Sequence, residues 1–296
     1  MLAPLWGCAS IATADDWPGS GAGGDAAASS SATTSSASTS GTGGEGAQGG
    51  SAGSGGGGGG GGREPDCVPA ENLAARWRAD DISPAASGVP VLVWPDTAGE
   101  NDLVGNEPSV PTLVLDALGG HAVVRFDGTD DRLTTSLAEI LDDVVFTVFI
   151  VSRSIDNSGI RTMFQGGDAN SVTSGFSFGF CDCALGMGAH FDTWSGASDS
   201  HNIVHLPDAQ TTSKTLWTVR RSDVELEVYR NSGSLKQVLK ELTLDVVSDQ
   251  FHVGAAGNGS GFWKGDVAEL LFYSVSITSE DREAIEDCLM SRYGLP

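Results

Sequence analysis

Short runs of β-branched and aromatic residues, separated by Gly, Asp and Asn turns, restrict the fold of this chain more than any other feature. Runs of this length and spacing are typical of antiparallel sandwiches. The chain is therefore predicted to be all-β. The expected strands cover residues 89–94, 121–126, 144–152, 175–180, 215–220, 224–230, 251–254 and 266–273.

The last segment has a helical pattern instead. Thr278 can cap a helix with Asp281 three residues later, and Gly294 can end it. Apolar residues between these points recur at helical spacing on one face. We therefore expect a short C-terminal amphipathic helix packed on the sandwich, with Ile285, Cys288, Leu289 and Tyr293 facing inward.

Residues 19–62 consist almost entirely of Gly, Ser, Ala and Thr. Such a segment has too little apolar surface to offset its ordering entropy, so a disordered tether is expected there. Three parts follow: a partial signal segment at 1–18, the tether at 19–62, and one domain at 63–296.

Leu5-Trp6-Gly7-Cys8 resembles a bacterial lipobox, although Trp6 stands where a small residue is usual. Cys8 is the candidate lipid-bearing residue, and a tether after an anchored Cys suits a domain held off a membrane. We expect an exported protein, at the outer membrane or cell surface or secreted. A chance Gly-Cys pair is the alternative.

The remaining cysteines are even in number, which in an exported chain predicts disulfides. Cys67 and Cys288 stand near the two ends of the domain, and a bridge between them would tie those ends together. Cys181 and Cys183 would share a strand face roughly 6.6 Å apart, near the upper limit for bridging.

Charge excludes some partners. The chain has 16 basic and 39 acidic residues and a net charge of −23. Such a surface repels nucleic acid and anionic lipid, so membrane contact is expected only through a lipid on Cys8. The oligomeric state is left open.

Several stretches together resemble bacterial laminin-G-like (concanavalin-A-like) jelly rolls. The resemblance implies an antiparallel β-sandwich jelly roll and leaves function open, because such folds host lectins, enzyme accessory domains and adhesins. The stretches are LAARWRAD at 73–80, WPD at 94–96, VVRFDGTDDRL at 123–133, residues 146–152 and 217–221, NSG at 231–233, FWKGDVAELLFY at 262–273 and YGL at 293–295.

The turn after residue 126 contains three carboxylates in five residues, Asp127, Asp130 and Asp131. Hard oxygen ligands on a loop make calcium the candidate cofactor. The alternative is an Asp-Gly turn in which Asp127 binds backbone amides. Asp96, Asn101 and Asp102 form a second loop with the same two interpretations.

Two loops carry aromatic residues beside polar ones, the arrangement with which sugar-binding surfaces stack a pyranose ring. Trp77, Trp94 and Trp217 are expected in the core instead. The candidate ligand-binding residues are His190, Asp192, Trp194, Asn258 and Trp263. Trp263 is the weaker candidate, because the family resemblance implies that its position begins a strand returning to the core and favours burial there.

Catalytic patterns are incomplete. Glu225 and Glu227 have the spacing of a glycosidase pair, but Arg230 stands where some concanavalin-A-like glycosidases have a further Glu. Ser177 lies in a Gly-x-Ser-x-Gly pattern without a following helix. Cys181, Cys183, His201 and His205 superficially resemble a zinc site, but the first two are too closely spaced.

The leading hypothesis is therefore a non-catalytic binding domain that recognises a glycan or a surface protein through loops at one rim of the sandwich. A glycoside hydrolase or lyase using Glu225 and Glu227 is the second hypothesis, and a structural spacer or adhesion module is the third.

Overall fold

The computed structural model describes residues 67–137, 145–167, 175–183, 186–194, 201–207, 209, 211–239 and 250–296. The predicted lipid site at Cys8 and the predicted tether at 19–62 lie outside these residues. So do the side chains of Cys181 and Cys183, so their bridge stays a prediction. Among the described residues, no helix has both the length and the apolar character needed to cross a membrane.

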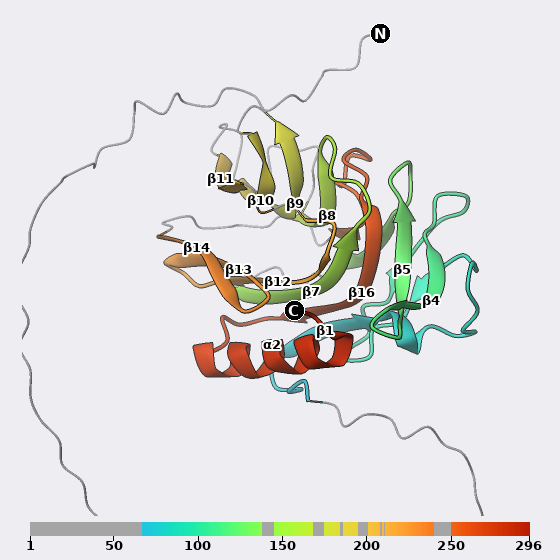
Figure 1. The fold of residues 1–296 in the computed structure, drawn as a ribbon, viewed down its shortest axis with the longest axis horizontal. Coiled ribbons are helices and arrows are strands. Elements are labelled where there is room, and N and C mark those ends of the chain that lie inside the picture. The colour runs from blue at the N-terminus through green and yellow to red at the C-terminus, as the bar shows by residue number, and fades with distance from the viewer. Residues whose placement is uncertain are drawn as a thin grey trace, which may run out of the picture. The chain divides into compact units, whose positions relative to one another are not determined.

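The described strands form two antiparallel eight-stranded sheets (Figure 1). Sheet A has the order β14-β13-β12-β7-β16-β5-β4, with β1 also paired to β16. Its strands are β1 (Leu73–Arg78), β4 (Thr112–Leu118), β5 (His121–Asp127), β7 (Phe146–Ser154), β12 (Lys214–Arg221), β13 (Glu225–Arg230), β14 (Gly233–Leu239) and β16 (Lys264–Tyr273).

Sheet B has the order β11-β10-β9-β8-β15-β6-β3-β2. It is built from strands that mostly come from the middle of the chain. Its strands are β2 (Val93–Trp94), β3 (Leu103–Val104), β6 (Leu133–Ser136), β8 (Arg161–Gly167), β9 (Gly175–Cys183), β10 (Gly186–Trp194), β11 (His201–Pro207) and β15 (Gln250–Val253).

The core lies between the sheets because alternate residues of each strand point inward. Phe176, Phe178 and Phe180 of β9 are all buried, as their spacing predicts. Phe178 and Phe180 meet the buried Trp217 of β12 edge to face, at centroid distances of 5.3 and 5.8 Å. Trp77, Trp94 and Trp217 are confirmed as core residues, since each is at most 1% exposed.

The helix α2 (Ser279–Tyr293) adds a third layer on the outer face of sheet A (Figure 1). Thr278 caps it by accepting a hydrogen bond from the Asp281 amide, and Gly294 ends it in the left-handed conformation. Both signals had been predicted. Its apolar face forms a second buried cluster with sheet A, to which Phe149, Val151, Leu216, Leu271, Ile285, Leu289 and Tyr293 belong.

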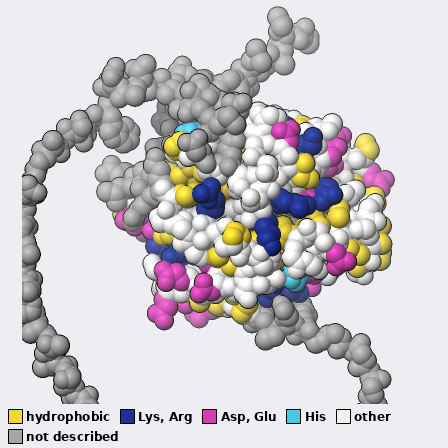
Figure 2. Space-filling view, in the orientation of Figure 1, with side chains coloured by type: hydrophobic (Ala, Val, Ile, Leu, Met, Phe, Trp, Pro, Cys, Tyr) yellow, Lys and Arg dark blue, Asp and Glu magenta, His cyan; other side chains and the backbone are white. Residues whose placement is uncertain are grey.

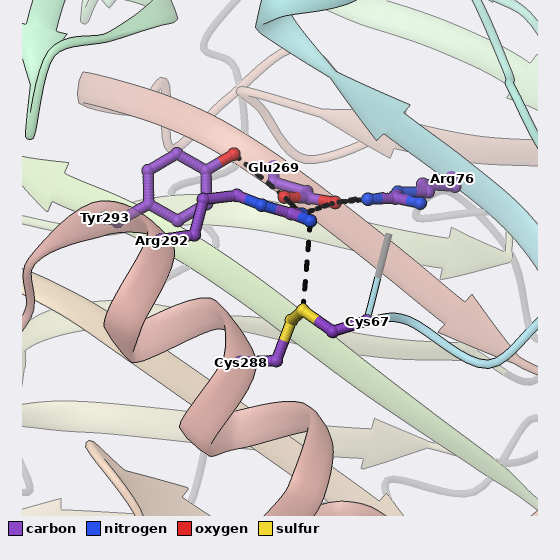
Figure 3. Close-up of a disulfide and its surroundings, with 6 residues drawn as sticks. All are labelled: Cys67, Arg76, Glu269, Cys288, Arg292 and Tyr293. Atoms are coloured by element: carbon purple, nitrogen blue, oxygen red, sulfur yellow. Dashed lines mark hydrogen bonds and ion pairs between the residues drawn. A yellow bond between two sulfur atoms is a disulfide. The ribbon is translucent and has the colours of Figure 1, made fainter. Parts of the chain in front are cut away.

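A buried ion cluster joins β1, β16 and α2 (Figure 3). The Glu269 carboxylate is wholly buried and receives hydrogen bonds from Arg76 Nε at 2.7 Å, Arg292 Nη1 at 3.0 Å and the Tyr293 hydroxyl at 2.8 Å. Burial, with the Glu269 charge beside it, raises the pKa of Tyr293. The hydroxyl therefore stays a neutral donor.

The predicted bridge between Cys67 and Cys288 is confirmed, with 6.0 Å between the two Cα atoms. It lies beside the ion cluster, where Arg292 Nη2 is 3.9 Å from Cys67 Sγ (Figure 3). The start of the described domain is thus fixed to its last helix.

The predicted all-β sandwich with a C-terminal amphipathic helix is confirmed. Several strands were missed, among them β4, β6, β8, β10 and β11. Gly, Asp and polar residues interrupt the apolar alternation in these segments, and their pairing partners supply the hydrogen bonds that local sequence does not indicate.

Candidate functional site

The turn after β5 brings together the three carboxylates that the sequence singles out. One oxygen from each of Asp127, Asp130 and Asp131 lies within 4.8 Å of the others. Gly128 has a positive φ of 80°, which permits the tight reversal. Hard oxygen ligands at this separation suit a cation such as calcium.

Each of these carboxylates also accepts a hydrogen bond from the protein. Asp127 accepts from the Thr129 amide at 2.7 Å, and Asp131 accepts from the Asp127 amide at 2.7 Å. Asp130 accepts from the Ser109 hydroxyl at 2.9 Å. These bonds support the turn interpretation, and calcium binding stays a prediction.

Asp131 differs from its two neighbours in being buried, with 6% exposure. Burial raises its pKa to about 6, against the bond from the Asp127 amide and with help from the charges of Asp127 and Asp130. No described cation forms an ion pair with it. The turn therefore contains a carboxylate that takes up a proton more readily than usual.

The second acidic loop has a structural role. Asp96 accepts hydrogen bonds from the amides of Arg76 at 2.8 Å and Ala98 at 2.9 Å. The Asp102 carboxylate in turn accepts from the Asp96 amide at 2.8 Å. Of its two interpretations, the structure supports the loop whose carboxylates hold backbone amides.

The loop of residues 254–261 folds against the start of β8. The Thr162 amide donates to Gly261 O at 2.7 Å, and the Gly254 amide donates to Met163 O at 2.9 Å. Asn258 is exposed on this loop and accepts from the Ser260 hydroxyl at 2.6 Å. Asn258, one of the predicted ligand-binding residues, is thus at the surface.

The prediction that Trp263 is a ligand-binding residue at the surface is wrong. Trp263 is 0% exposed and packs edge to face on Phe180 in the core, with 5.4 Å between ring centroids. Adjacent residues in extended chain point to opposite sides. Phe262 is the half-buried aromatic residue at the surface, so the predicted aromatic contact is displaced by one position.

The 127–131 turn and the 254–261 loop meet. Arg132 Nη1 donates to Gly257 O at 3.3 Å, and Arg161 Nη1 donates to Phe262 O at 2.9 Å while lying 3.5 Å from Gly128 O. These two arginines hold the loops at one rim of the sandwich.

A pocket of about 230 Å³ lies between the 127–131 turn and the 254–261 loop, and we name it the rim pocket. Polar groups of several kinds point into it from segments far apart in the sequence. Its lining residues are Val104, Asn106, Ser109, Asp130, Arg132, Thr134, Gly259 and Phe262. Asp130 was a predicted site residue, whereas Asn106, Ser109, Arg132 and Phe262 were missed.

The predicted loop at 190–201 begins as part of strand β10, whose last residue, Trp194, lies at the other end of sheet B, and residues 195–200 are outside the described residues. Trp194 pairs with Gly175, and Gly175 pairs with Gly167 at the end of β8. The 254–261 loop contacts the start of β8, near Thr162. Trp194 and Asn258 therefore do not share a rim, and the side chains of Asp192 and Trp194 lie outside the described residues.

His190 lies within β10 and is paired directly with His205 of β11. Both side chains are half-buried on the outer face of sheet B. The His205 ring lies over Gly188, where an added Cβ would be 2.6 Å from Cε1. The side chains of Cys181, Cys183 and His201 lie outside the described residues, so the zinc site stays a prediction.

The glycosidase hypothesis meets an obstacle at Glu227. Its carboxylate is bound by the Arg220 guanidinium and by the Tyr229 hydroxyl at 2.8 Å. Burial would raise the pKa of Glu227, but these hydrogen bonds outweigh it and lower the pKa. Glu227 is therefore held as a charged ion-pair partner rather than as an acid.

Ser177 lies inside β9, paired with Asp192 on one side and Gln165 on the other. Ser177 is 9% exposed. A nucleophile elbow needs a sharp strand-to-helix turn, and this position has none.

Comparison with known proteins supports the fold. No family model and no curated protein matches the chain. The botulinum neurotoxin serotype D binding domain superposes with a TM-score of 0.54 at 11% identity, covering 75% of this chain and 52% of that one. A botulinum neurotoxin type C structure gives 0.52 at 12% identity, covering 74% and 52%.

The Trypanosoma rangeli sialidase in complex with sialic acid gives a TM-score of 0.52 at 14% identity, covering 74% of this chain and 33% of that one. This chain therefore spans about half of the toxin chains and a third of the sialidase. At these identities the likeness concerns the fold alone, an antiparallel β-sandwich.

Proposed function

We propose that the domain is a non-catalytic carbohydrate-binding module whose ligand occupies the rim pocket. The observation that carries this proposal is the lining of the pocket. It combines hydroxyl, amide, carboxylate and guanidinium groups with the apolar side chains of Val104 and Phe262. Sugars present the same combination, with hydroxyls at the ring edge and C–H groups on its faces.

The size of the rim pocket supports a small ligand unit. Its volume of about 230 Å³ is below the roughly 300–1,000 Å³ of pockets for drug-sized molecules, which suits one sugar residue. Val104 of the pocket lining pairs with Val93 on the neighbouring strand, and these two residues are 45% and 46% exposed. This apolar strip offers a surface on which a longer glycan could continue.

The neighbours add support of a general kind. The serotype D structure is named a binding domain, and the type C title states that cell entry depends on interaction with two ganglioside molecules. The sialidase was solved with sialic acid. Glycan recognition is therefore known among proteins with this fold.

We further propose that the domain is displayed outside the cytosol. The Cys67–Cys288 disulfide supports this, because such bonds persist in oxidising compartments. Alkylation of protein taken directly from cells, followed by mass spectrometry, should find both cysteines protected. Free thiols at both positions would contradict export.

The test of the rim pocket begins with a glycan array and continues with calorimetry on the best ligand. Asp130→Asn and Phe262→Ala should each weaken binding about tenfold or more, since a hydrogen bond to a charged group contributes about 1.5–3 kcal/mol. Asp223→Asn, an exposed acid in the turn before β13, is the matched control. Binding unaffected by both pocket variants, or no glycan bound at all, would overturn the proposal.

A further inference from the structure

A row of charged residues crosses the outer face of sheet A beyond the end of α2. Lys214 of β12 pairs with Arg153 of β7, Arg153 pairs with Asp266 of β16, and Asp266 pairs with Arg125 of β5. Directly paired residues of neighbouring strands share a face. The four side chains therefore form one continuous row.

The row shares its face with the apolar residues beneath α2. Val151 lies two residues before Arg153 and Leu216 two residues after Lys214, and both belong to the cluster under the helix. A spacing of two keeps side chains on one face of a strand. The row therefore lies on the part of this face that α2 does not cover.

Asp266 fixes the two arginines. Its carboxylate is wholly buried and accepts from Arg125 Nε at 2.7 Å, Arg125 Nη2 at 3.1 Å and Arg153 Nε at 3.1 Å, and Arg153 Nη2 also contacts it. The arginine side chains themselves are 36% and 35% exposed. No described residue accepts a hydrogen bond from Nη1 of either, so both guanidinium groups keep donors for a ligand.

Arg153 and Lys214 line a pocket of about 490 Å³, here named the basic pocket. Its walls carry the hydroxyls of Thr212 and Ser213 and aliphatic side chains, including Leu118 and Leu295. Lys214 Nζ is held in place by Tyr293 O at 3.2 Å. Figure 2 shows several Lys and Arg side chains gathered in the middle of the surface that it presents.

The charge of the row is opposite to that of the whole chain. Three cations face one carboxylate here, in a protein of net charge −23. A planar guanidinium held by its Nε edge suits a second planar, bidentate partner such as a carboxylate. The overall negative potential opposes highly charged anions, which favours a monoanion over a phosphate ester.

We propose that the basic pocket binds a carboxylate on a compact, partly apolar body, such as an acidic sugar residue or the carboxyl end of a peptide. Arg153 receives the carboxylate, Lys214 supplies the second positive charge, and the hydroxyls of Thr212 and Ser213 bind polar groups of the body. This site is separate from the rim pocket and does not depend on the function proposed for it.

The test is an NMR titration of the full chain with two pairs of probes. Glucuronate is compared with glucose, and a short peptide with a free carboxyl end with its amidated form. We expect shifts at residues of the basic pocket with the carboxylates and none with their neutral counterparts. The member that binds more tightly identifies the source of the carboxylate.

Arg153→Gln and Lys214→Gln should each weaken this binding about tenfold or more, in line with the contribution of a charge-assisted hydrogen bond. Lys214 does not contact Asp266, so its variant remains informative if Arg153→Gln folds poorly. Lys264→Gln removes a positive charge from a residue that lines neither pocket; it is the control and should leave carboxylate binding unchanged. Equal shifts with charged and neutral probes, no shifts at all, or unchanged affinity in both variants would overturn the proposal.

Discussion

Two clusters of arginine and carboxylate lie three residues apart on β16, and their surroundings differ. Glu269 and Asp266 are both wholly buried, and each binds two arginines. The arginines of Glu269, Arg76 and Arg292, are 6% and 4% exposed. Those of Asp266, Arg125 and Arg153, are 36% and 35% exposed.

The difference follows from the position of α2. The helix covers the Glu269 cluster and contributes Arg292 and the Tyr293 hydroxyl to it, but it ends before the Asp266 cluster. The covered cluster joins elements from both ends of the domain. The uncovered cluster also has two arginines bound to its carboxylate, but one of them, Arg153, lines the basic pocket. Similar ion pairing can thus serve cohesion in one place and recognition in another.

Removing the covered carboxylate should have the largest effect. Glu269→Gln leaves two buried arginines without their counter-charge, and breaking a buried ion pair in this way costs about 3–5 kcal/mol. The free energy of unfolding in urea measures the loss. Glu283→Gln, in an ion pair whose carboxylate is 64% exposed, is the control and should change stability by about 0.5 kcal/mol or less. A loss below about 1 kcal/mol for Glu269→Gln would show that the cluster adds little cohesion.

The disulfide beside that cluster should rank next. The double variant Cys67→Ala, Cys288→Ala should lose about 2–4 kcal/mol, because the bridge restricts the unfolded chain across a separation of 221 residues. Thermal unfolding of the oxidised wild type, the reduced wild type and the double variant measures this. Reduction should lower the Tm of the wild type toward that of the double variant. Equal melting of all three proteins would mean that α2 is fixed without the bridge.

Asp131 extends the comparison to a buried carboxylate that forms no ion pair with a described residue. Its pKa is raised from 3.8 to about 6, so the folded protein keeps a proton that the unfolded chain releases. The free energy of unfolding should therefore fall as pH rises from about 4 to about 6, by at most about 3 kcal/mol, and stay lower above that range. Urea unfolding in a chelator, at a series of pH values, measures the slope.

Asp131→Asn should flatten this slope and be more stable than the wild type at pH 7, whereas the exposed Asp130→Asn should keep it. Under the calcium hypothesis, added calcium raises the Tm of the wild type at pH 7 and leaves that of Asp131→Asn unchanged. A Tm that does not respond to calcium would leave these residues with the turn alone. A slope that persists in Asp131→Asn would place its origin in another group.

The two clusters also show which parts of the structure could be predicted from the sequence. The sandwich and the Thr278 cap were predictable because alternation and capping are local signals. The Cys67–Cys288 bridge was predictable because its two cysteines stand near the two ends of the domain. The partnership of Arg76 with Glu269 spans 193 positions and depends on strand order, which alternation does not give. Asp266 and Glu269, two carboxylates within the buried strand β16, were the available signs of buried ion pairs.

The same reasoning applies to the rim pocket. Its loops at 127–131 and 254–261 were identified from composition, but Asn106 and Ser109 reach it from a third segment that carried no motif. The choice between Phe262 and Trp263 required the strand phase at the start of β16. That phase is set by pairing with β5 and β7 rather than by the loop itself.

The smallest expected effect separates the two arginine clusters most sharply. Arg153→Gln should cost about 1 kcal/mol or less, because a partly exposed ion pair is screened by water and Asp266 keeps Arg125. Arg76→Gln, the equivalent change in the covered cluster, should cost several times more, since Glu269 cannot be rehydrated. Urea unfolding of both variants at low and high salt compares them, and only the loss in Arg153→Gln should shrink with salt. Equal losses that are insensitive to salt would mean that Arg153 is as much a part of the protein's cohesion as Arg76, and the basic pocket would then be a by-product of packing.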